Sequence, residues 1–149
     1  MVTTVSSTAV TIRGVTKYFG PENNRVTALR GVDLTVNNGE LLMLVGPSGC
    51  GKTTLISVIA GILNHDEGEC LVFDQDLKAM GAPARTHFRG QNIGFVFQAF
   101  NLLPTLSAVE NIAIPLLIQG CARSQALKRA TVLLERVGLG QRGGALPSQ

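Results

Sequence analysis

Gly46-Pro47-Ser48-Gly49-Cys50-Gly51-Lys52-Thr53 satisfies the pattern G-x-x-x-x-G-K-[ST], and its surroundings are as informative as the pattern. Five consecutive apolar residues, Leu41–Val45, precede it, and a segment without Gly or Pro, Lys52–Ala60, follows. An uninterrupted apolar run bounded by turn residues predicts a strand covered on both faces, as in parallel sheets. The expected order is therefore strand, loop, helix, with Gly61 ending the helix.

The residue types in this loop suit a polyphosphate. Glycines let successive backbone N–H groups turn inward, and the N-terminus of the following helix adds partial positive charge. Lys52 can pair with β- and γ-phosphates, and the Thr53 hydroxyl can complete the coordination of magnesium. The competing interpretation is a Gly-rich turn that only joins a strand to a helix. The predicted nucleotide-contacting residues are Gly46, Pro47, Ser48, Gly49, Cys50, Gly51, Lys52, Thr53 and, with a weaker claim, Thr54.

Further strands are expected where apolar residues alternate or cluster between turn residues. The sequence predicts an exposed edge strand at Val10–Val15, and further strands at Val26–Leu29, Val32–Val36, Leu71–Phe73 and Ile93–Phe97.

The last third of the chain predicts helices. Ser107 and Glu110 have the spacing of a capping box, so a helix should start at about Ala108, and Pro115 should kink or end it. A second helical pattern begins at Ser124. Its expected buried face is Ala126, Ala130, Leu133 and Val137, and Gly138 is expected to close it.

Composition excludes several classes of protein. The 149 residues are 45% hydrophobic and 15% charged, which is typical of a globular chain. The net charge of +3 is not concentrated in any basic run, which argues against nucleic acid as a partner. No secretory leader is recognised at the start, and no apolar run approaches the roughly 20 residues of a membrane span.

The sparse cysteines and histidines predict neither a metal site nor a disulfide framework. Cys50, Cys70 and Cys121 lie far apart, which fits a reducing compartment. His65 and His87 have no partners at metal-ligand or catalytic spacing, and His65 is expected on the surface because it lies in a polar turn.

Val45–Leu55 resembles the Walker A segment of the ATP-binding cassette (ABC) transporter ATPases. Three more segments resemble that family in the same order along the chain. Gly14–Phe19 is similar to its first strand and A-loop, and Ile93–Gln98 to the approach to its Q-loop. Asn101–Ile112 is similar to the segment after the Q-loop in the branch that serves lipoprotein-release and macrolide-type exporters. The resemblance covers nearly the whole chain.

The resemblance implies two more site residues. Phe19 matches the aromatic that stacks on adenine, and its neighbour Tyr18 could substitute for it; the alternative is an aromatic packed in a core. Gln98 matches the residue that contacts magnesium and the attacking water, a catalytic role; the alternative is a solvated loop residue. Asp74 stands where the family has a glycine after a strand.

The implied fold is an α/β P-loop NTPase. Its mostly parallel core sheet should carry an N-terminal antiparallel β subdomain and the start of a helical subdomain. Residues 1–149 would then form a partial ATP-binding domain whose C-terminal part is missing. Within it, residues 1–98 are expected to hold the β subdomain and P-loop core, and residues 99–149 the beginning of the helical subdomain.

The implied function is the ATP-binding component of an ABC transporter. Such a component couples binding and hydrolysis of Mg-ATP to transport through a membrane permease, with export favoured by the branch. The expected partners are the permease, contacted through Gln98–Ile118, and a second ATP-binding subunit. The expected location is cytoplasmic, peripheral on the inner face of the membrane.

Several family motifs are absent from the 149 residues. No L-S-G-G-Q signature follows Leu146–Gln149, and neither the Walker B Asp, the catalytic Glu nor the switch His has a counterpart. We therefore expect the chain to bind Mg-ATP without hydrolysing it. The alternative is a non-catalytic fragment or structural partner that keeps nucleotide contacts. An ABC protein acting on nucleic acid is less favoured, since it should carry zinc-type cysteine pairs or basic inserts.

Overall fold

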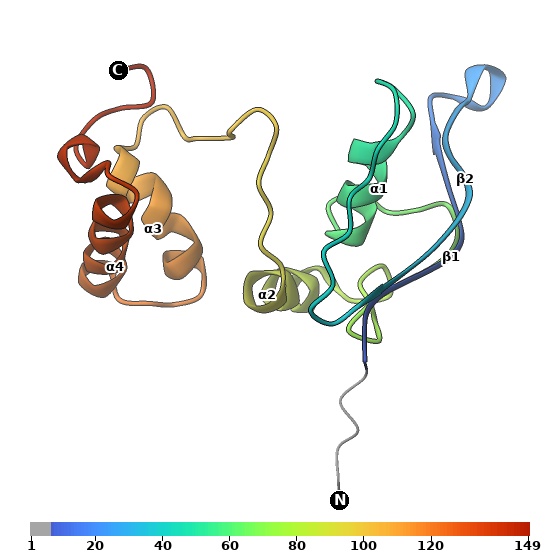
Figure 1. Cartoon of the computed structure of the whole chain (residues 1–149), viewed down its shortest axis with the longest axis horizontal. Helices are drawn as coiled ribbons and strands as arrows, with labels where there is room; N and C mark the ends of the chain where they lie inside the picture. Colours follow the sequence, from blue (N-terminus) through green and yellow to red (C-terminus); the bar gives the residue numbers. More distant parts are fainter. Residues whose placement is uncertain (1–6) are drawn as a thin grey trace, which may run out of the picture. The chain divides into compact units, whose positions relative to one another are not determined.

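A computed structural model describes residues 7–149, and the chain divides into two units, Met1–Arg89 and Gly90–Gln149 (Figure 1). The elements of the first unit are β1 (Thr8–Phe19), the 3-10 turn η1 (Glu22–Asn24), β2 (Val26–Asn37), α1 (Lys52–Ile59), β3 (Glu67–Val72) and β4 (Gln75–Asp76). Helix α2 (Ala82–Asn92) spans the boundary. The second unit contains α3 (Ala108–Ile118), α4 (Arg123–Arg136) and η2 (Gly140–Arg142).

The strands of the first unit form one antiparallel sheet in the order β2-β1-β3-β4. Ile12 of β1 is paired with Leu34 of β2 on one side and with Cys70 of β3 on the other. The strands expected around Val10, Val26, Val32 and Leu71 are confirmed, with the middle two joined into β2. The expectation that β1 is an edge strand is wrong, because β3 arrives from more than fifty residues away to cover its second edge.

Helix α1 packs its apolar side against this sheet. Leu55 and Val58 of α1 join Ile12, Val15 and Cys70 in one buried cluster. An eight-residue helix is marginal in isolation, so the burial of each such side chain, worth about 1.5–3 kcal/mol, stabilises it. The helix predicted after the glycine-rich loop is confirmed, and Gly61 follows its end with φ +64°.

The expected parallel core sheet is not formed by residues 7–149. Leu41–Val45 and Ile93–Phe97 were both predicted as strands, and neither belongs to one. Leu41, Val45 and Val96 are 89%, 87% and 97% exposed. A strand needs a neighbour to receive its N–H and C=O groups, and no described strand lies beside either run.

The β3–β4 hairpin turns through two residues in the left-handed region, Phe73 (φ 49°) and Asp74 (φ 59°). Two-residue hairpin turns with positive φ at both positions match the twist of antiparallel strands. Asp tolerates this conformation far better than most side chains, which explains how Asp74 can replace a glycine.

The second unit contains α3 and α4 lying side by side (Figure 1). At the start of α3 the Glu110 carboxylate accepts hydrogen bonds from the Ser107 N–H at 3.1 Å and the Ser107 hydroxyl at 2.9 Å, as the capping-box spacing predicts. Those bonds, the backbone one first, lower the pKa of Glu110. Pro115 lies within α3, so it does not end the helix, and the other expected effect, a kink, stays a prediction.

Small residues bring the two helices together. Ala113 of α3 and Ala126 and Ala130 of α4 are fully buried against each other. The buried stripe of α4 continues to Leu134, whereas Leu133 and Val137 are 47% and 69% exposed. The predicted face was therefore wrong at its C-terminal half. Helix α4 ends at Arg136, and Gly138 has φ +76°, as expected for a closing glycine.

In the described part of the chain no helix has the length and apolar character needed to cross a membrane.

Candidate nucleotide-binding site

The glycine-rich loop lies between the extended run Leu41–Val45 and α1. Gly49 (φ +80°) and Gly51 (φ +95°) adopt conformations that L side chains rarely occupy, so the loop can turn sharply at both positions. Helix α1 begins immediately afterwards, and the N–H groups of its first turn have no acceptor inside the helix. The start of α1 thus presents donors and the positive end of its dipole.

The Lys52 side chain folds back over this loop. Its ammonium donates hydrogen bonds to the carbonyl oxygens of Gly46 and Pro47, both at 2.7 Å, and lies 3.5 Å from the Cys50 sulfur. The loop therefore surrounds a full positive charge at the start of a helix. A polyphosphate entering the loop would exchange these carbonyl contacts for stronger, charge-assisted ones.

Strand β2 supports the loop from one side. A Cβ at Gly51 would lie 2.5 Å from the Ala28 carbonyl oxygen and 3.1 Å from Leu29 Cδ2, so the loop backbone touches the strand backbone there. A cavity of about 360 Å³ opens between β2 and the tip of the loop. Its lining residues are Thr27, Ala28, Leu29, Arg30, Val32, Gly49 and Cys50.

Thr53 is the described residue that fits magnesium. It is exposed in the first turn of α1, one residue after Lys52, and its hydroxyl is a hard oxygen ligand. Across residues 7–149 no group of three or more His, Cys, Asp or Glu side chains is placed to hold a metal ion. Magnesium usually keeps several waters and is bound largely through substrate phosphates, so the Thr53 hydroxyl suits an ion that arrives on phosphate oxygens.

The two adjacent aromatics at the end of β1 have different environments. Phe19 is 42% exposed, with the Lys17 ammonium 5.6 Å from its ring centroid. The Tyr18 ring lies 5.0 Å from the Arg25 guanidinium, and its hydroxyl donates a hydrogen bond to Glu67 at 3.1 Å. That bond is the main cause of the raised pKa of Tyr18. Phe19 is therefore more available to an incoming base than Tyr18.

Strand β2 lies beside both Phe19 and the glycine-rich loop. Phe19 is paired with Val26, and Gly51 lies against Ala28, two residues further along the same strand. Val26 and Ala28 are thus close together on β2, next to an irregularity in its pairing with β1. The same strand thus contacts Phe19 and Gly51, two residues of different predicted motifs that are 32 positions apart in sequence.

Gln98 belongs to the second unit, where it lies exposed in a turn after the Ile93–Phe97 run. Its predicted contact with magnesium and water stays a prediction. Sequence reasoning did not single out Lys17, which lies over the Phe19 ring, or Asp66, which pairs with Lys17. The spacing of Lys17 and Phe19, two apart on one strand, was the available signal.

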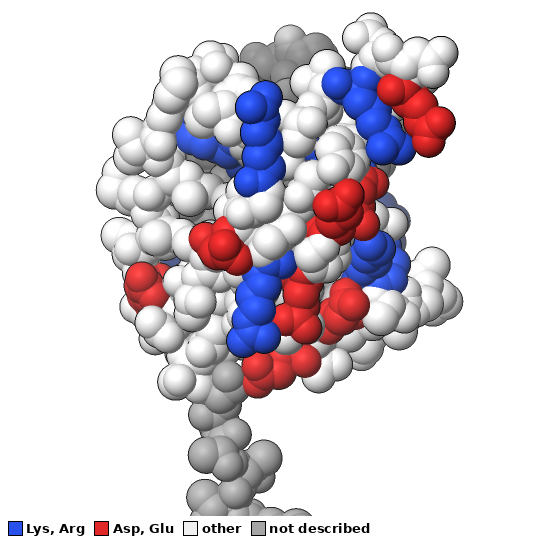
Figure 2. Space-filling model, turned by 90° about the vertical axis from the view of Figure 1, so that its right-hand side faces the viewer, with Lys and Arg blue, Asp and Glu red and all other residues white. Residues whose placement is uncertain are grey.

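The charge of the chain is unevenly divided between its units. Met1–Arg89 contains eight Lys and Arg and eight Asp and Glu, and the face drawn in Figure 2 shows the two signs intermixed. Gly90–Gln149 contains five basic and two acidic residues and so holds the whole net charge of +3. Attraction of an anion to the loop therefore depends on Lys52 and α1 rather than on the overall charge of the first unit.

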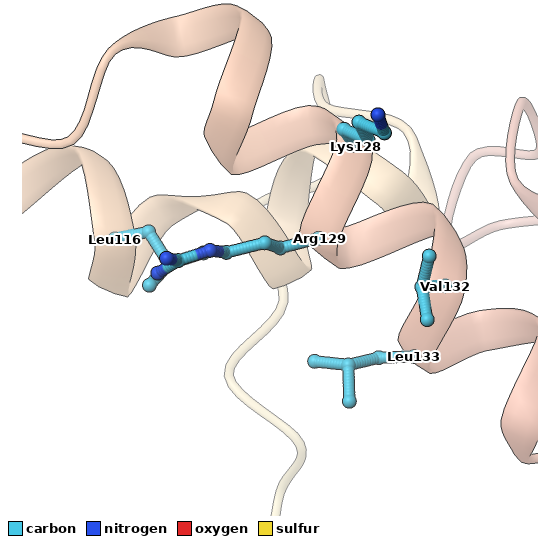
Figure 3. Close-up of a pocket in the computed structure, with 5 residues that line it drawn as sticks. All are labelled: Leu116, Lys128, Arg129, Val132 and Leu133. Carbon is cyan, nitrogen blue, oxygen red and sulfur yellow. The ribbon is translucent and has the colours of Figure 1, made fainter.

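The second unit has an apolar pocket of about 420 Å³ on α3 and α4 (Figure 3). Leu116, Val132 and Leu133 line it together with Lys128 and Arg129, and the Arg129 side chain extends toward Leu116. No glycine lines this pocket, so it lacks the glycine-rich turn that makes the Gly46–Thr53 loop suitable for phosphate.

Comparison with known proteins agrees with the motifs. A family profile for the ABC transporter matches residues 29–147. The chain is 40% identical over 140 residues to the "Uncharacterized ABC transporter ATP-binding protein YbbA" of Escherichia coli K12, covering 94% of this chain and 61% of that protein. It is also 40% identical over 145 residues to the "Lipoprotein-releasing system ATP-binding protein LolD" of Roseobacter denitrificans, covering 96% and 63%.

A solved structure is also similar: the dimeric, post-hydrolysis state of the ATP-binding cassette MJ0796 bound to ADP and Pi. Its TM-score is 0.87 at 32% identity, over 94% of this chain and 62% of that one. The chain thus spans about three fifths of the length of these three proteins. Since the glycine-rich loop, the antiparallel β subdomain and the family profile all coincide, this chain belongs to the ABC transporter family, as part of an ATP-binding domain similar to YbbA and LolD.

Proposed function

We propose that this chain binds Mg-ATP through the Gly46–Thr54 loop. The observation that carries the proposal is the Lys52 ammonium, held by two loop carbonyls at the N-terminus of α1. Backbone N–H groups of the loop and the Lys52 charge would bind the β- and γ-phosphates. Thr53 would be the protein ligand of magnesium, with Thr54 beside it.

Phe19 supplies the platform for adenine in this proposal. Its exposed ring lies at the end of β1, beside the strand that supports the loop. A flat aromatic face binds a base without reading its hydrogen-bonding edge. Tyr18 is the less favoured platform because its hydroxyl is already hydrogen-bonded to Glu67.

We further propose that Gln98 contacts magnesium and the attacking water when ATP is hydrolysed by a complete ATP-binding domain. Phosphoryl transfer needs positioned groups around the attacking water as well as around the phosphates. The 149 residues offer the phosphate-binding groups, and no Asp or Glu in them matches the catalytic base of the family. The chain by itself is therefore expected to bind Mg-ATP without turnover.

The wider role proposed is that of the ATP-binding component of a transporter, acting with a membrane permease on the cytoplasmic face. Exposed apolar residues cluster in Gln98–Ile118, the segment proposed to meet the permease: Phe100, Leu102, Leu103, Leu117 and Ile118. A relative whose name places it in a lipoprotein-releasing system supports export. The dimeric state of the similar cassette supports pairing with a second ATP-binding subunit.

The alternative is a non-catalytic nucleotide-binding partner within such an assembly. It shares the nucleotide site and differs in never contributing to hydrolysis. Phosphate release from a complete ATP-binding domain that contains these residues, assembled with its permease and abolished by Lys52→Ala, would favour the transporter ATPase over this alternative.

Isothermal titration with ATP and magnesium tests the nucleotide proposal. The unmodified chain should give a saturable signal, Lys52→Ala should lose it, and Lys128→Ala on the second unit should bind as the unmodified chain does. Circular dichroism of the three proteins establishes that folding is equal. Absence of binding in well-folded, monodisperse protein, or equal binding by Lys52→Ala, would overturn the proposal.

A further inference from the structure

The Lys17 ammonium lies between a carboxylate and an aromatic ring. Its Nζ is 3.1 Å from Asp66 Oδ2 and 3.2 Å from Asp66 Oδ1, and it lies 5.6 Å from the centroid of Phe19. Lys17 and Phe19 are two residues apart near the end of β1, where the pairing with β2 is irregular. The cation therefore links the start of β3 to the aromatic at the end of β1.

Lys17 is unusually well covered for a lysine. Its side chain is 14% exposed, compared with 73% for Arg13, which makes a similar β1–β3 ion pair with Glu69 at 3.2 Å. Lysine is seldom covered to this degree unless its charge is paired. Lys17 is therefore more closely surrounded by protein than Arg13, whose ion pair lies on the surface.

The carboxylate that holds Lys17 is itself fixed to the backbone of β1. Asp66 Oδ2 accepts a hydrogen bond from the Tyr18 N–H at 2.6 Å, and the Asp66 N–H donates to the Thr16 carbonyl at 2.9 Å. The Tyr18 bond is the main cause of the lowered pKa of Asp66, with the contact to Lys17 adding to it. Asp66 is thus a charged anchor with little freedom.

Phe19 has no comparable anchor of its own. It is the last residue of β1, is 42% exposed, and precedes Gly20. A cation over one face of a ring restrains the ring and leaves the opposite face for a ligand. Without the cation, an exposed ring at a strand end would sample several rotamers, and ordering it on binding costs affinity.

We propose that Lys17, anchored by Asp66, is a positioning residue that orients Phe19 for stacking on the base of a nucleotide. This rests on the proposed function and assigns to Lys17 a part of base binding that the phosphate loop does not contribute. The loop contacts the phosphates through Lys52 and α1, so base binding and phosphate binding can be measured separately.

Isothermal titration of the 149-residue chain with Mg-ATP and with magnesium tripolyphosphate, which has no base, tests this. Lys17→Ala should weaken ATP binding by about tenfold, the order of one base–aromatic stack, and leave tripolyphosphate binding unchanged. Phe19→Ala should do the same, and the double variant should be no weaker than either single one. Lys17→Arg, which keeps the cation, should restore ATP binding to within about twofold.

Arg13→Ala is the matched control, because it removes a β1–β3 ion pair that touches no aromatic ring in the described structure. It should bind both ligands as the unmodified chain does. Asp66→Asn removes the anchoring charge and should weaken ATP binding selectively, as Lys17→Ala does.

The chain contains no tryptophan, so Phe19→Trp introduces a single fluorescent reporter. Its emission should respond to ATP and not to tripolyphosphate. Adding Lys17→Ala should make the fluorescence anisotropy of Trp in the free protein decay faster, because the ring loses its restraint.

Three outcomes overturn the inference: Lys17→Ala binding ATP as tightly as the unmodified chain, Lys17→Ala losing both ligands equally, or Arg13→Ala reproducing the ATP-selective loss. An unmodified chain that binds neither ligand overturns the proposed function and this inference together. A chain that binds tripolyphosphate as tightly as ATP retains the phosphate site and rejects only the role of Lys17 and Phe19.

Discussion

The Gly51 Cα lies against the main chain of Ala28, so that a side-chain carbon at position 51 would stand 2.5 Å from the Ala28 carbonyl oxygen. Gly51 also has φ +95°, outside the range of ordinary residues. Two independent constraints, conformation and space, thus require glycine where the loop enters α1. The nearby Gly49 has only the first: its φ is +80°, and a Cβ added there would meet no described atom within 4 Å beyond its chain neighbours.

Gly51→Ala should therefore destabilise the chain more than Gly49→Ala does. Backbone strain costs about 1–3 kcal/mol at either position. Displacing the Ala28 main chain should add about 1–2 kcal/mol at Gly51 alone. Urea denaturation measures both, and equal losses of stability would show that β2 does not support the loop. ATP titration should show weaker binding for Gly51→Ala.

The buried His65 predicts a loss of stability on mild acidification. It is 6% exposed, contrary to the surface position expected from sequence, and burial is the main reason that its pKa is lowered. The unfolded state, with a pKa near 6.5, then binds more protons than the folded state. The contribution of neutral His65 to the free energy of unfolding is therefore complete above about pH 6.5 and is lost as pH falls through the lower pKa of the folded state.

His65→Gln should flatten the pH dependence of the unfolding free energy between about pH 7.5 and pH 5.5. His87 is exposed, so His87→Gln provides a control that should keep the unmodified slope. Denaturation curves at several pH values supply the comparison. If His87→Gln alone flattened the slope, burial of His65 could not be the cause.

Of the two residues with positive φ in the β3–β4 turn, Phe73 is less suited to this conformation than Asp74. A bulky side chain at φ 49° is strained, and at 42% exposure it has little packing to lose. Phe73→Asn should raise the free energy of unfolding by about 0.5–1 kcal/mol, because Asn adopts this conformation readily. Phe73→Leu keeps the strain and should give no gain. Thermal unfolding of the two variants and the unmodified chain measures the difference in stability, and an equal gain in both variants would contradict the prediction.

The exposed run Leu41–Val45 should promote self-association. Leu41 and Met43 are 89% and 77% exposed in an extended segment with no strand partner in the described structure. Met43→Lys should reduce sedimenting aggregates while changing the free energy of unfolding by less than about 0.5 kcal/mol. Leu44 packs against the core, so Leu44→Lys should destabilise the fold instead. Unchanged aggregation in Met43→Lys would place the associating surface elsewhere.

Local chemistry was predictable because it depends on residues close in sequence. The glycine-rich loop, the helix after it, the Ser107–Glu110 cap and the closing Gly138 follow from backbone conformation and hydrogen bonds within a few residues. The family followed from the same short motifs, and the profile match agrees with it.

Strand pairing and side-chain burial were not predictable in this way. Five apolar residues at Leu41–Val45 predict a buried strand, yet burial needs a neighbour, and the fold of residues 7–149 places none there. Likewise, a one-residue shift in the α4 face buries Leu134 instead of Leu133, because the partner helix decides which stripe is covered.

The sequence alone predicted which groups are suited to a polyphosphate, since the conformation of a short glycine-rich loop ahead of Lys52 and Thr53 depends mainly on residues within it. Only the tertiary structure decided that Phe19 and that loop share the support of β2, and that Asp66 reaches Lys17 across the sheet. The physical reason is that antiparallel pairing, not chain order, sets which distant residues become neighbours.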